Sequence, residues 1–382
     1  MTVKKKKSKT KPSVSTKKKA QPKRNKKKNI NRKLDIIKSK IKSNILIIII
    51  FCTATLLIIS TYAWFSASLN VKVKFFDLVV SSDNGLFISL DGIDYSDSVE
   101  ISLNSVINEL KATYPNHTNR WAIGGLWPVS SNGIKNANQD KFSTYIGEVN
   151  KYKTKDKSKN GKKFLNATLS IEDEPTPFSS YIAFDIFLKN VSGSPKPDNL
   201  YLDEGTYIDY ADDIDEEVKD TMNGIMNSMR FGFVKISSVP HNTDVRTVQN
   251  LKCNNQCEMF IYEPNEKSHS EESIKNAKEL GITIVDGEYT PTYGIINEGR
   301  FLEHTNGHEG TGIPLDTEHF ALQKTIKYSD FDWPVFSIPN GVTKLRAYVW
   351  IEGQDIDSLE TYSKGAAIYL SINFVKDLAG YE

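Results

Sequence analysis

The sequence predicts a mainly β protein: an antiparallel β-sandwich with one or two helical insertions, preceded by a single transmembrane helix and a disordered basic tail. Three observations predict this arrangement. Charge divides sharply along the chain, an apolar run lies at the division, and the remainder consists of short alternating segments separated by polar turns.

The chain begins with a strongly basic tail. Residues 1–43 contain 19 basic residues and one acidic residue, Asp35, so their net charge is +18. Residues 44–382 contain the other 30 basic residues and 46 acidic residues, a net charge of −16. Met1–Lys33 is low in complexity, and we expect it to be disordered. Beside a membrane helix its lysines attract anionic lipid headgroups, and nucleic-acid binding is not expected.

The apolar run Ile45–Ile59 contains no charge and no helix breaker. Extended to Phe65 it has 21 residues, close to the ~20 that a helix needs to cross hydrocarbon. We expect Ile45–Phe65 to contact membrane lipid, with Tyr62 and Trp64 at the outer interface. The positive-inside rule then keeps the N-terminus in the cytoplasm and exports the C-terminal part.

The same run also fits a cleavable signal, because its strictly apolar part has only 15 residues and Ala63 is a small residue suited to cleavage before Trp64. The length of the basic region favours a retained anchor. We expect a cytoplasmic tail at 1–43, a transmembrane helix or signal anchor at 44–65, and an acidic extracellular β-rich domain at 66–382. The protein is then a single-pass cell-membrane protein, or a secreted one if it is cut near Ala63.

Period-2 alternation predicts strands in the exported part. Residues 345–351 and 367–374 alternate clearly and are rich in β-branched and aromatic residues. Similar segments are Val71–Val80, Leu86–Leu90, Phe164–Ile171, Tyr181–Lys189, Tyr201–Ile208, Arg230–Ile236 and Met259–Tyr262. About 315 residues is large for one sandwich, so either long insertions or two stacked β-modules are expected.

Two segments have helical spacing. Apolar residues recur every three or four positions in Asp215–Met229, which predicts a helix with a stripe facing the core. Ser268–Glu271 has the capping-box pattern ahead of an apolar-periodic segment that ends at Gly281. The lysine-rich stretch Lys151–Lys163 predicts a solvated basic loop.

Cysteine usage agrees with export. Cys52 lies in the apolar run, and the exported part contains only Cys253 and Cys257. Two cysteines so close together in an exported polar loop predict a small-loop disulfide. Half of a metal site is the alternative, although the sequence has no second cysteine pair.

Several short motifs resemble a known family. Thr61–Ser66, directly after the apolar run and before a strand, resembles the corresponding region of TasA/camelysin-type proteins, which are exported surface and biofilm-matrix proteins of Gram-positive bacteria. Val349–Asp355, Leu126–Ser130 and Phe184–Asn190 resemble uncharacterised exported proteins of low-GC Gram-positive bacteria. These motifs cover short parts of the chain, and none of them is a catalytic signature.

The resemblance implies a jelly-roll-like β-sandwich, removal of the signal near Ala63 by a dedicated signal peptidase, and assembly into fibres by strand donation from the N-terminus. The long basic tail departs from the short signal peptide of that family. Cleavage, and with it fibre assembly, therefore stays open at this point.

Camelysin-like proteins are sometimes grouped with metallopeptidases, so zinc has to be considered. His304 and His308 are four residues apart and are flanked by Glu303 and Glu309, a ligand set that zinc accepts. A zincin helix, however, needs a glutamate directly after the first histidine and a helical spacer. Thr305 stands there instead, and an Asn-Gly pair follows it. A polar surface loop is the simpler interpretation.

Two acidic stretches, Asp209–Glu217 and Glu352–Asp357, suit calcium, which takes six to eight oxygen ligands. Neither has EF-hand spacing, and the second is equally suited to a hairpin turn. No cofactor is therefore expected, with a structural calcium or zinc ion as the alternative.

The sequence has no Gly-rich phosphate loop, nucleophile elbow or dinucleotide-binding pattern, so it favours no enzyme class. We expect a non-enzymatic cell-surface or extracellular-matrix structural protein that self-associates by β-strand pairing, through a strand such as Val71–Val80, and contacts cell-wall or matrix components. An adhesive domain that binds carbohydrate or wall polymer is the first alternative. A camelysin-like metallopeptidase is the second.

Overall fold

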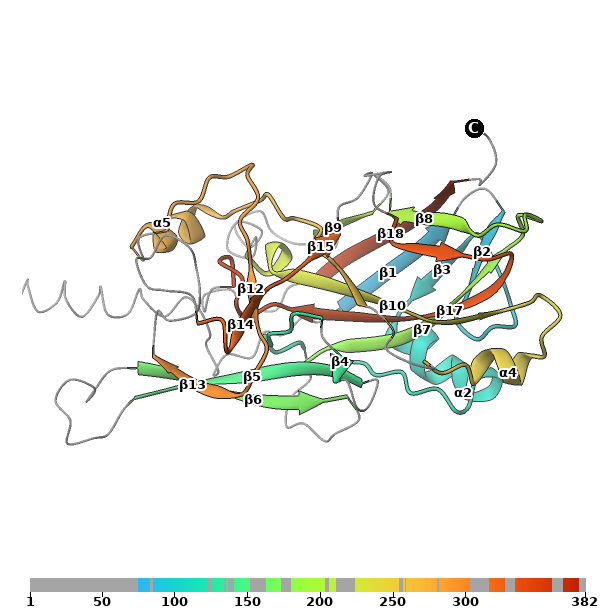
Figure 1. Ribbon diagram of the computed structural model, residues 1–382, viewed down its shortest axis with the longest axis horizontal. Helices are drawn as coiled ribbons and strands as arrows, with labels where there is room; N and C mark the ends of the chain where they lie inside the picture. Colours follow the sequence, from blue (N-terminus) through green and yellow to red (C-terminus); the bar gives the residue numbers. More distant parts are fainter. Residues whose placement is uncertain are drawn as a thin grey trace, which may run out of the picture. The chain divides into compact units, whose positions relative to one another are not determined.

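The structure is a computed structural model that describes residues 75–82, 85–122, 125–133, 135–136, 141–151, 163–172, 180–202, 206–210, 224–253, 257, 259–279, 282–302, 316–326, 334–358 and 367–377. The chain divides into two units, Met1–Ile59 and Ser60–Glu382, and every described residue lies in the second. These residues are mainly β, in several largely antiparallel sheets with a few short helices (Figure 1).

Sheet A has six strands and contains both the first and the last strand of the described chain. Its order is β16 (Phe336–Ile338), β8 (Asp198–Leu202), β18 (Ala367–Asp377), β1 (Phe75–Ser82) and β3 (Ser98–Ile101), and β9 (Tyr207–Tyr210) also pairs with β18. Every pair is antiparallel except β1 with β18, which run parallel, side by side in Figure 1. A hairpin cannot join parallel strands, so the rest of the domain forms the connection.

Sheet B also has six strands. Its order is β15 (Thr325–Ile326), β11 (Met259–Tyr262), β10 (Met229–Val239), β17 (Gly341–Ile351), β7 (Ile182–Asn190) and β2 (Leu86–Ser89). The long central pair, β10 with β17, is antiparallel and changes register between Lys235 and Ser237. The short edge pair, β11 with β15, is the parallel exception in this sheet.

Two smaller sheets complete the described chain. Sheet C has the order β13 (Gly299–Leu302), β6 (Lys163–Ile171), β5 (Lys141–Lys151) and β4 (Lys135–Asn136). β12 (Tyr293–Ile295) pairs with β14 (Phe320–Leu322). β5 and β6 stay paired as far as Lys151 and Lys163. The ends of the predicted basic loop are therefore strand residues, and its middle, 152–162, lies outside the described residues.

The main hydrophobic core is built from the facing sides of sheets A and B. Alternate residues of each strand enter it, as the two-residue period of a strand requires; they include Phe184, Ile186 and Leu188 on β7, Leu345, Ala347 and Val349 on β17, and Leu370, Ile372 and Phe374 on β18. Each leucine, isoleucine, valine or phenylalanine among them contributes roughly 1.5–3 kcal/mol by leaving water.

β17 is buried on both faces. All eleven of its residues are buried, although alternation in a strand is typical of one buried and one exposed face. Tyr348 and Trp350 point away from the main core into a second apolar cluster that also contains Phe142 and Tyr181. The alternation in this strand thus separates two buried environments, one aliphatic and one aromatic and ionic.

Most predicted strands are confirmed, with ends that differ by a few residues: β1, β2, β6, β7, β10, β11, β17 and β18. The single strand predicted at Tyr201–Ile208 is wrong. The chain there belongs to β8 and β9, which pair with different parts of β18. Val71–Lys74, the start of the first predicted strand, lies outside the described residues.

The helix predictions are confirmed in part. α5 (Glu271–Glu279) is present, but Ser270 rather than Ser268 caps it, accepting a hydrogen bond from the Ser273 backbone N–H at 3.2 Å. Of the helix predicted at 215–229, residues 224–227 are helical and Met229 begins β10, where its side chain enters the main core.

Three short helical segments were not evident from the sequence. They are the π-helical turn η1 (Asn104–Glu109), α2 (Leu110–Thr113) and α4 (Val245–Gln249). α4 has a local signal, because the side chain of Asp244 accepts a hydrogen bond from the Thr247 backbone N–H at 3.0 Å.

Candidate functional site

Strand β1 occupies an interior position in sheet A. All eight of its residues pair with Ala367–Phe374 of β18, and Leu78–Ser81 also pair with β3 on the other side. An interior strand uses backbone hydrogen bonds on both edges, so removing it exposes two rows of unpaired groups. The strand that follows the hydrophobic segment in sequence is thus bonded to the last strand of the domain.

β18 provides the acceptor for β1. Leu370, Ile372 and Phe374 are fully buried in the main core. Their strand has β1 on one edge and β8 and β9 on the other. Any extended segment in the place of β1 would gain the same backbone hydrogen bonds. This is the geometry that strand addition requires.

On the outer face of sheet B, the turn Glu352–Asp357 forms a buried ionic cluster with Arg230. Nη2 of Arg230 contacts Glu263 Oε1 at 3.0 Å and pairs with Asp355 Oδ2. Burial by itself lowers the pKa of Arg230, but Glu263 and Asp355 raise it above its usual range. Burial raises the pKa of Glu263 well above its usual range, although the charge of Arg230 opposes the shift.

Glu352 fixes the start of this turn. Its Oε2 accepts hydrogen bonds from Gln323 Nε2 at 2.6 Å and Trp350 Nε1 at 3.2 Å, and its Oε1 accepts one from the Gln354 backbone N–H at 3.0 Å. Burial raises the pKa of Glu352 although Arg230 opposes the shift. These contacts tie the end of β17 to Gln323, the residue that follows β14, and to its own turn.

His269 connects the same turn to the segment before α5. Its Nδ1 lies 2.8 Å from Asp357 Oδ2, and its Nε2 lies 3.1 Å from both the Glu288 carbonyl oxygen and Thr290 Oγ1. A carbonyl oxygen can only accept, so Nε2 carries a proton. Burial lowers the pKa of His269, but the hydrogen bond and charge of Asp357 outweigh it and raise that pKa overall.

The order Asp357, His269, Thr290 has the connectivity of a catalytic triad, but not its proton states. In a triad the histidine nitrogen that faces the nucleophile must be free to accept a proton. Here that nitrogen donates to a backbone carbonyl, and Asp357 favours the doubly protonated ring. The arrangement therefore clamps two segments together and does not activate Thr290.

A second ionic network lies on the outer face of sheet B. Arg346 contacts Asp185 Oδ1 at 3.2 Å and Glu172 Oε1 at 2.8 Å, and Lys344 contacts Asp185 Oδ2 at 3.3 Å. Tyr114 donates to Asp185 at 2.7 Å. Burial raises the pKa of Asp185, but Arg346 and Lys344 outweigh it and lower the pKa below its usual value. The network fastens the loops beyond η1 and sheet C to β7 and β17.

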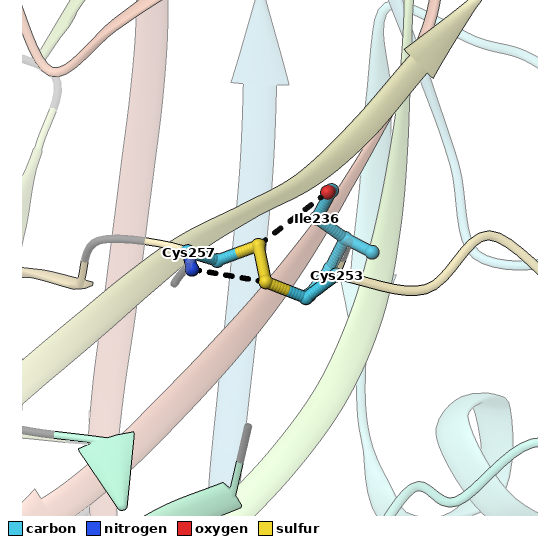
Figure 2. The surroundings of a disulfide bond; sticks show 3 residues. All are labelled: Ile236, Cys253 and Cys257. Carbon is cyan, nitrogen blue, oxygen red and sulfur yellow. Dashed lines mark hydrogen bonds between the residues drawn. A yellow bond between two sulfur atoms is a disulfide. The ribbon is translucent and has the colours of Figure 1, made fainter. Parts of the chain in front are cut away.

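The predicted disulfide is present. Cys253 and Cys257 are bonded, and Figure 2 shows the bridge beside β10, where Cys257 Sγ lies 3.5 Å from the Ile236 carbonyl oxygen. Both sulfurs are committed to this bond, so these two cysteines are not free to be thiolate ligands for a metal.

The predicted zinc ligands Glu303, His304, His308 and Glu309 lie outside the described residues. Among the residues that are described, no group of three or more His, Cys, Asp or Glu side chains is arranged to hold a metal ion. Of the two acidic stretches, Glu352–Asp357 is bound to Arg230 and His269, and the part of Asp209–Glu217 after Tyr210 is not described.

The predicted membrane segment 44–65, the basic tail 1–43, and the cleavage position at Ala63 and Trp64 also lie outside the described residues. Within the described ranges, no helix is long and apolar enough to span a bilayer.

Comparisons with protein-family models, curated proteins and solved structures found no match to this chain.

The ionic residues are the part of the site that sequence reasoning missed. Lys344, Arg346 and Arg230 alternate with core residues along β17 and β10, a pattern that ordinarily marks a solvent face. Their acidic partners are far away in sequence, so no local motif indicates the pairing.

Proposed function

We propose that the chain is a non-enzymatic structural protein of the cell surface or extracellular matrix that self-associates by exchanging strand β1. The observation that carries this proposal is the place of β1, interior in sheet A and parallel to β18. In the monomer β1 fills its own sheet. In an assembly, β1 of one copy would fill the same place beside β18 of the next.

The proposal includes a jelly-roll-like β-sandwich formed by sheets A and B, with the helical segments as insertions. Ile45–Phe65 would anchor the domain in membrane lipid, with the basic tail in the cytoplasm and residues 66–382 outside. Cleavage near Ala63 would release the domain and free the chain ahead of β1. A tethered β1 then favours the closed monomer, and a released β1 favours exchange.

Processing and assembly can be tested on one preparation. N-terminal sequencing of the membrane and medium fractions shows whether the chain is retained or starts near Trp64. We expect the retained form to be monomeric, and the released form to give elongated assemblies by electron microscopy. Released protein that stays monomeric at every concentration contradicts strand exchange.

An adhesive domain is less well supported. Exposed aromatic side chains on one sheet face would favour carbohydrate binding, but Tyr207 is the one large aromatic side chain that is well exposed among the residues whose burial the structure describes. Its ring lies 5.9 Å from that of Tyr369.

The metallopeptidase hypothesis rests on His304 and His308, and metal analysis of the purified protein tests it directly.

A further inference from the structure

Three strands carry a polar residue where their core pattern calls for an apolar one. On β7, Asn190 follows Leu188 on the inward face. On β18, Lys376 follows Phe374 in the same way, and on β8, Asp198 precedes Leu200. Since side chains two residues apart share a face of a strand, all three polar side chains are directed toward the space between the two sheets.

The three side chains meet there. Nζ of Lys376 lies 2.8 Å from Oδ1 of Asn190 and 3.4 Å from Oδ2 of Asp198. Nδ2 of Asn190 donates to the same Asp198 oxygen at 3.0 Å, and lies 3.3 Å from the carbonyl oxygens of Ile338 and Pro339. Asn190 and Asp198 are 0 % exposed and Lys376 is 5 % exposed. The contacts join sheet B, through Asn190, to sheet A.

These contacts bring together two groups that can react with each other, a lysine amine and a side-chain amide. The lysine nitrogen is held against the side-chain amide of Asn190, and the carboxylate of Asp198 touches both the attacking nitrogen and the nitrogen that would leave. Burial excludes the water that would keep the lysine ammonium solvated, and a buried charge pair is costly to maintain. Conversion of the lysine to an amide would remove one of these charges permanently.

We propose that Lys376 and Asn190 form an intramolecular isopeptide bond, with Asp198 as the group that moves the protons. Asp198 takes a proton from the Lys376 ammonium, and the neutral Nζ attacks Cγ of Asn190. The Cγ–Nδ2 bond breaks after Nδ2 gains a proton through Asp198, and ammonia leaves. The remaining proton stays on Asp198 or departs with the product as ammonium. No oxidant, metal or cofactor is consumed.

The bond would tie the two large sheets together near the end of β18. Residues 190 and 376 are 186 positions apart, so the bond closes a long loop and restricts the unfolded chain. It would also fix β18, the strand against which β1 lies. The domain could then release or accept β1 without losing the rest of sheet A.

Mass spectrometry tests the bond in the protein as isolated. The purified full-length chain is denatured and reduced, its intact mass is measured, and N-terminal sequencing fixes its first residue. We expect a mass lower than that of the sequence by one ammonia, and a protease digest that contains a branched peptide joining the Asn190 and Lys376 segments. The full sequence mass, with no branched peptide, overturns the proposal.

Variants test the roles. Lys376→Met removes the nucleophile and Asp198→Ala removes the proton carrier, so both should keep the full mass, with circular dichroism to show that each is folded. Lys196→Arg, at an exposed lysine two residues before Asp198, should still lose ammonia. Loss of ammonia in folded Asp198→Ala contradicts the role of Asp198. If either variant fails to fold, the wild-type mass and digest decide the question alone.

Discussion

Individual buried ion pairs hold the turns and loops against the outer face of sheet B. Arg230 is fully buried and touches two carboxylates, Glu263 and Asp355. Such a cluster contributes little net stability relative to apolar residues, yet removing one partner leaves an uncompensated group in the interior. The cluster therefore matters for where the turn Glu352–Asp357 sits more than for the total free energy of folding.

Replacing Arg230 should destabilise the domain strongly. We expect Arg230→Met to lower the free energy of unfolding by ~3–5 kcal/mol, because Asp355 and Glu352 lose the cation that offsets their burial. Urea denaturation measures the change. Arg246→Met, at an exposed residue of α4, is the matched control and should change stability by less than about 0.5 kcal/mol. Equal losses of stability in the two variants would contradict the stabilising role of Arg230 in the cluster.

The His269 clamp predicts a pH dependence. Its pKa is raised in the folded protein, so the clamp contributes its full stability below the unfolded pKa, ~6.5, and loses it as pH rises through the folded pKa. Wild-type protein minus His269→Gln should therefore show a stability advantage at pH 6 that shrinks on the alkaline side. His241→Gln, at an exposed histidine, should leave the profile unchanged. An advantage that grows with pH would rule out the protonated clamp.

At the scale of elements, β1 is the strand on which the proposed function depends. Val79 lies in the part of β1 that is paired on both edges, opposite Ser371 of β18 and Glu100 of β3. Proline there cannot donate a hydrogen bond and leaves a ladder acceptor unpaired. We expect Val79→Pro to cost at least ~1–3 kcal/mol and to abolish assembly of the released form.

Calorimetry and electron microscopy of the same sample measure these two effects. Val79→Thr is the control, because it keeps both the backbone N–H and a β-branched side chain. It should assemble like the wild type. A Val79→Pro protein that still forms assemblies would show that β1 is not the exchanged strand.

The elements that sequence predicts well are those with a local cause. β11 and α5 are evident from a few residues of alternation or capping, and the disulfide from two cysteines four positions apart. The parallel pairing of β1 with β18 has no such signal, because its partners lie at opposite ends of the described chain. The Arg346 pair with Glu172 spans 174 residues.

A charged residue on an alternating strand is ordinarily exposed. The burial of Lys344 and Arg346 depends on a second layer, the segment that includes Tyr114 and sheet C, covering sheet B. No property of β17 alone indicates that cover. The same reasoning applies to Lys376, whose side chain is buried although a lysine is ordinarily exposed to solvent.

For the whole molecule, the charge division and the strand order lead to one hypothesis. A basic tail and an apolar run precede an acidic β-rich domain, and the strand next in sequence, β1, fills an interior place beside the last strand. Retention or release of the domain would decide whether β1 stays in its own sheet. The lysines of the tail lie directly before the apolar run, which favours a cytoplasmic N-terminus by the positive-inside rule.

The most direct test places one cysteine on each partner strand. Two differently tagged chains, both with Cys52→Ser, carry Val79→Cys and Ser371→Cys respectively, at positions that face each other across β1 and β18. After mixing and release of the domain, strand exchange predicts a disulfide between the two tagged chains, and a Phe75→Cys chain in place of Val79→Cys should give none with Ser371→Cys. If the two chains never cross-link, while a chain carrying both cysteines closes on itself in every sample, β1 remains in its own domain and the proposed assembly is contradicted.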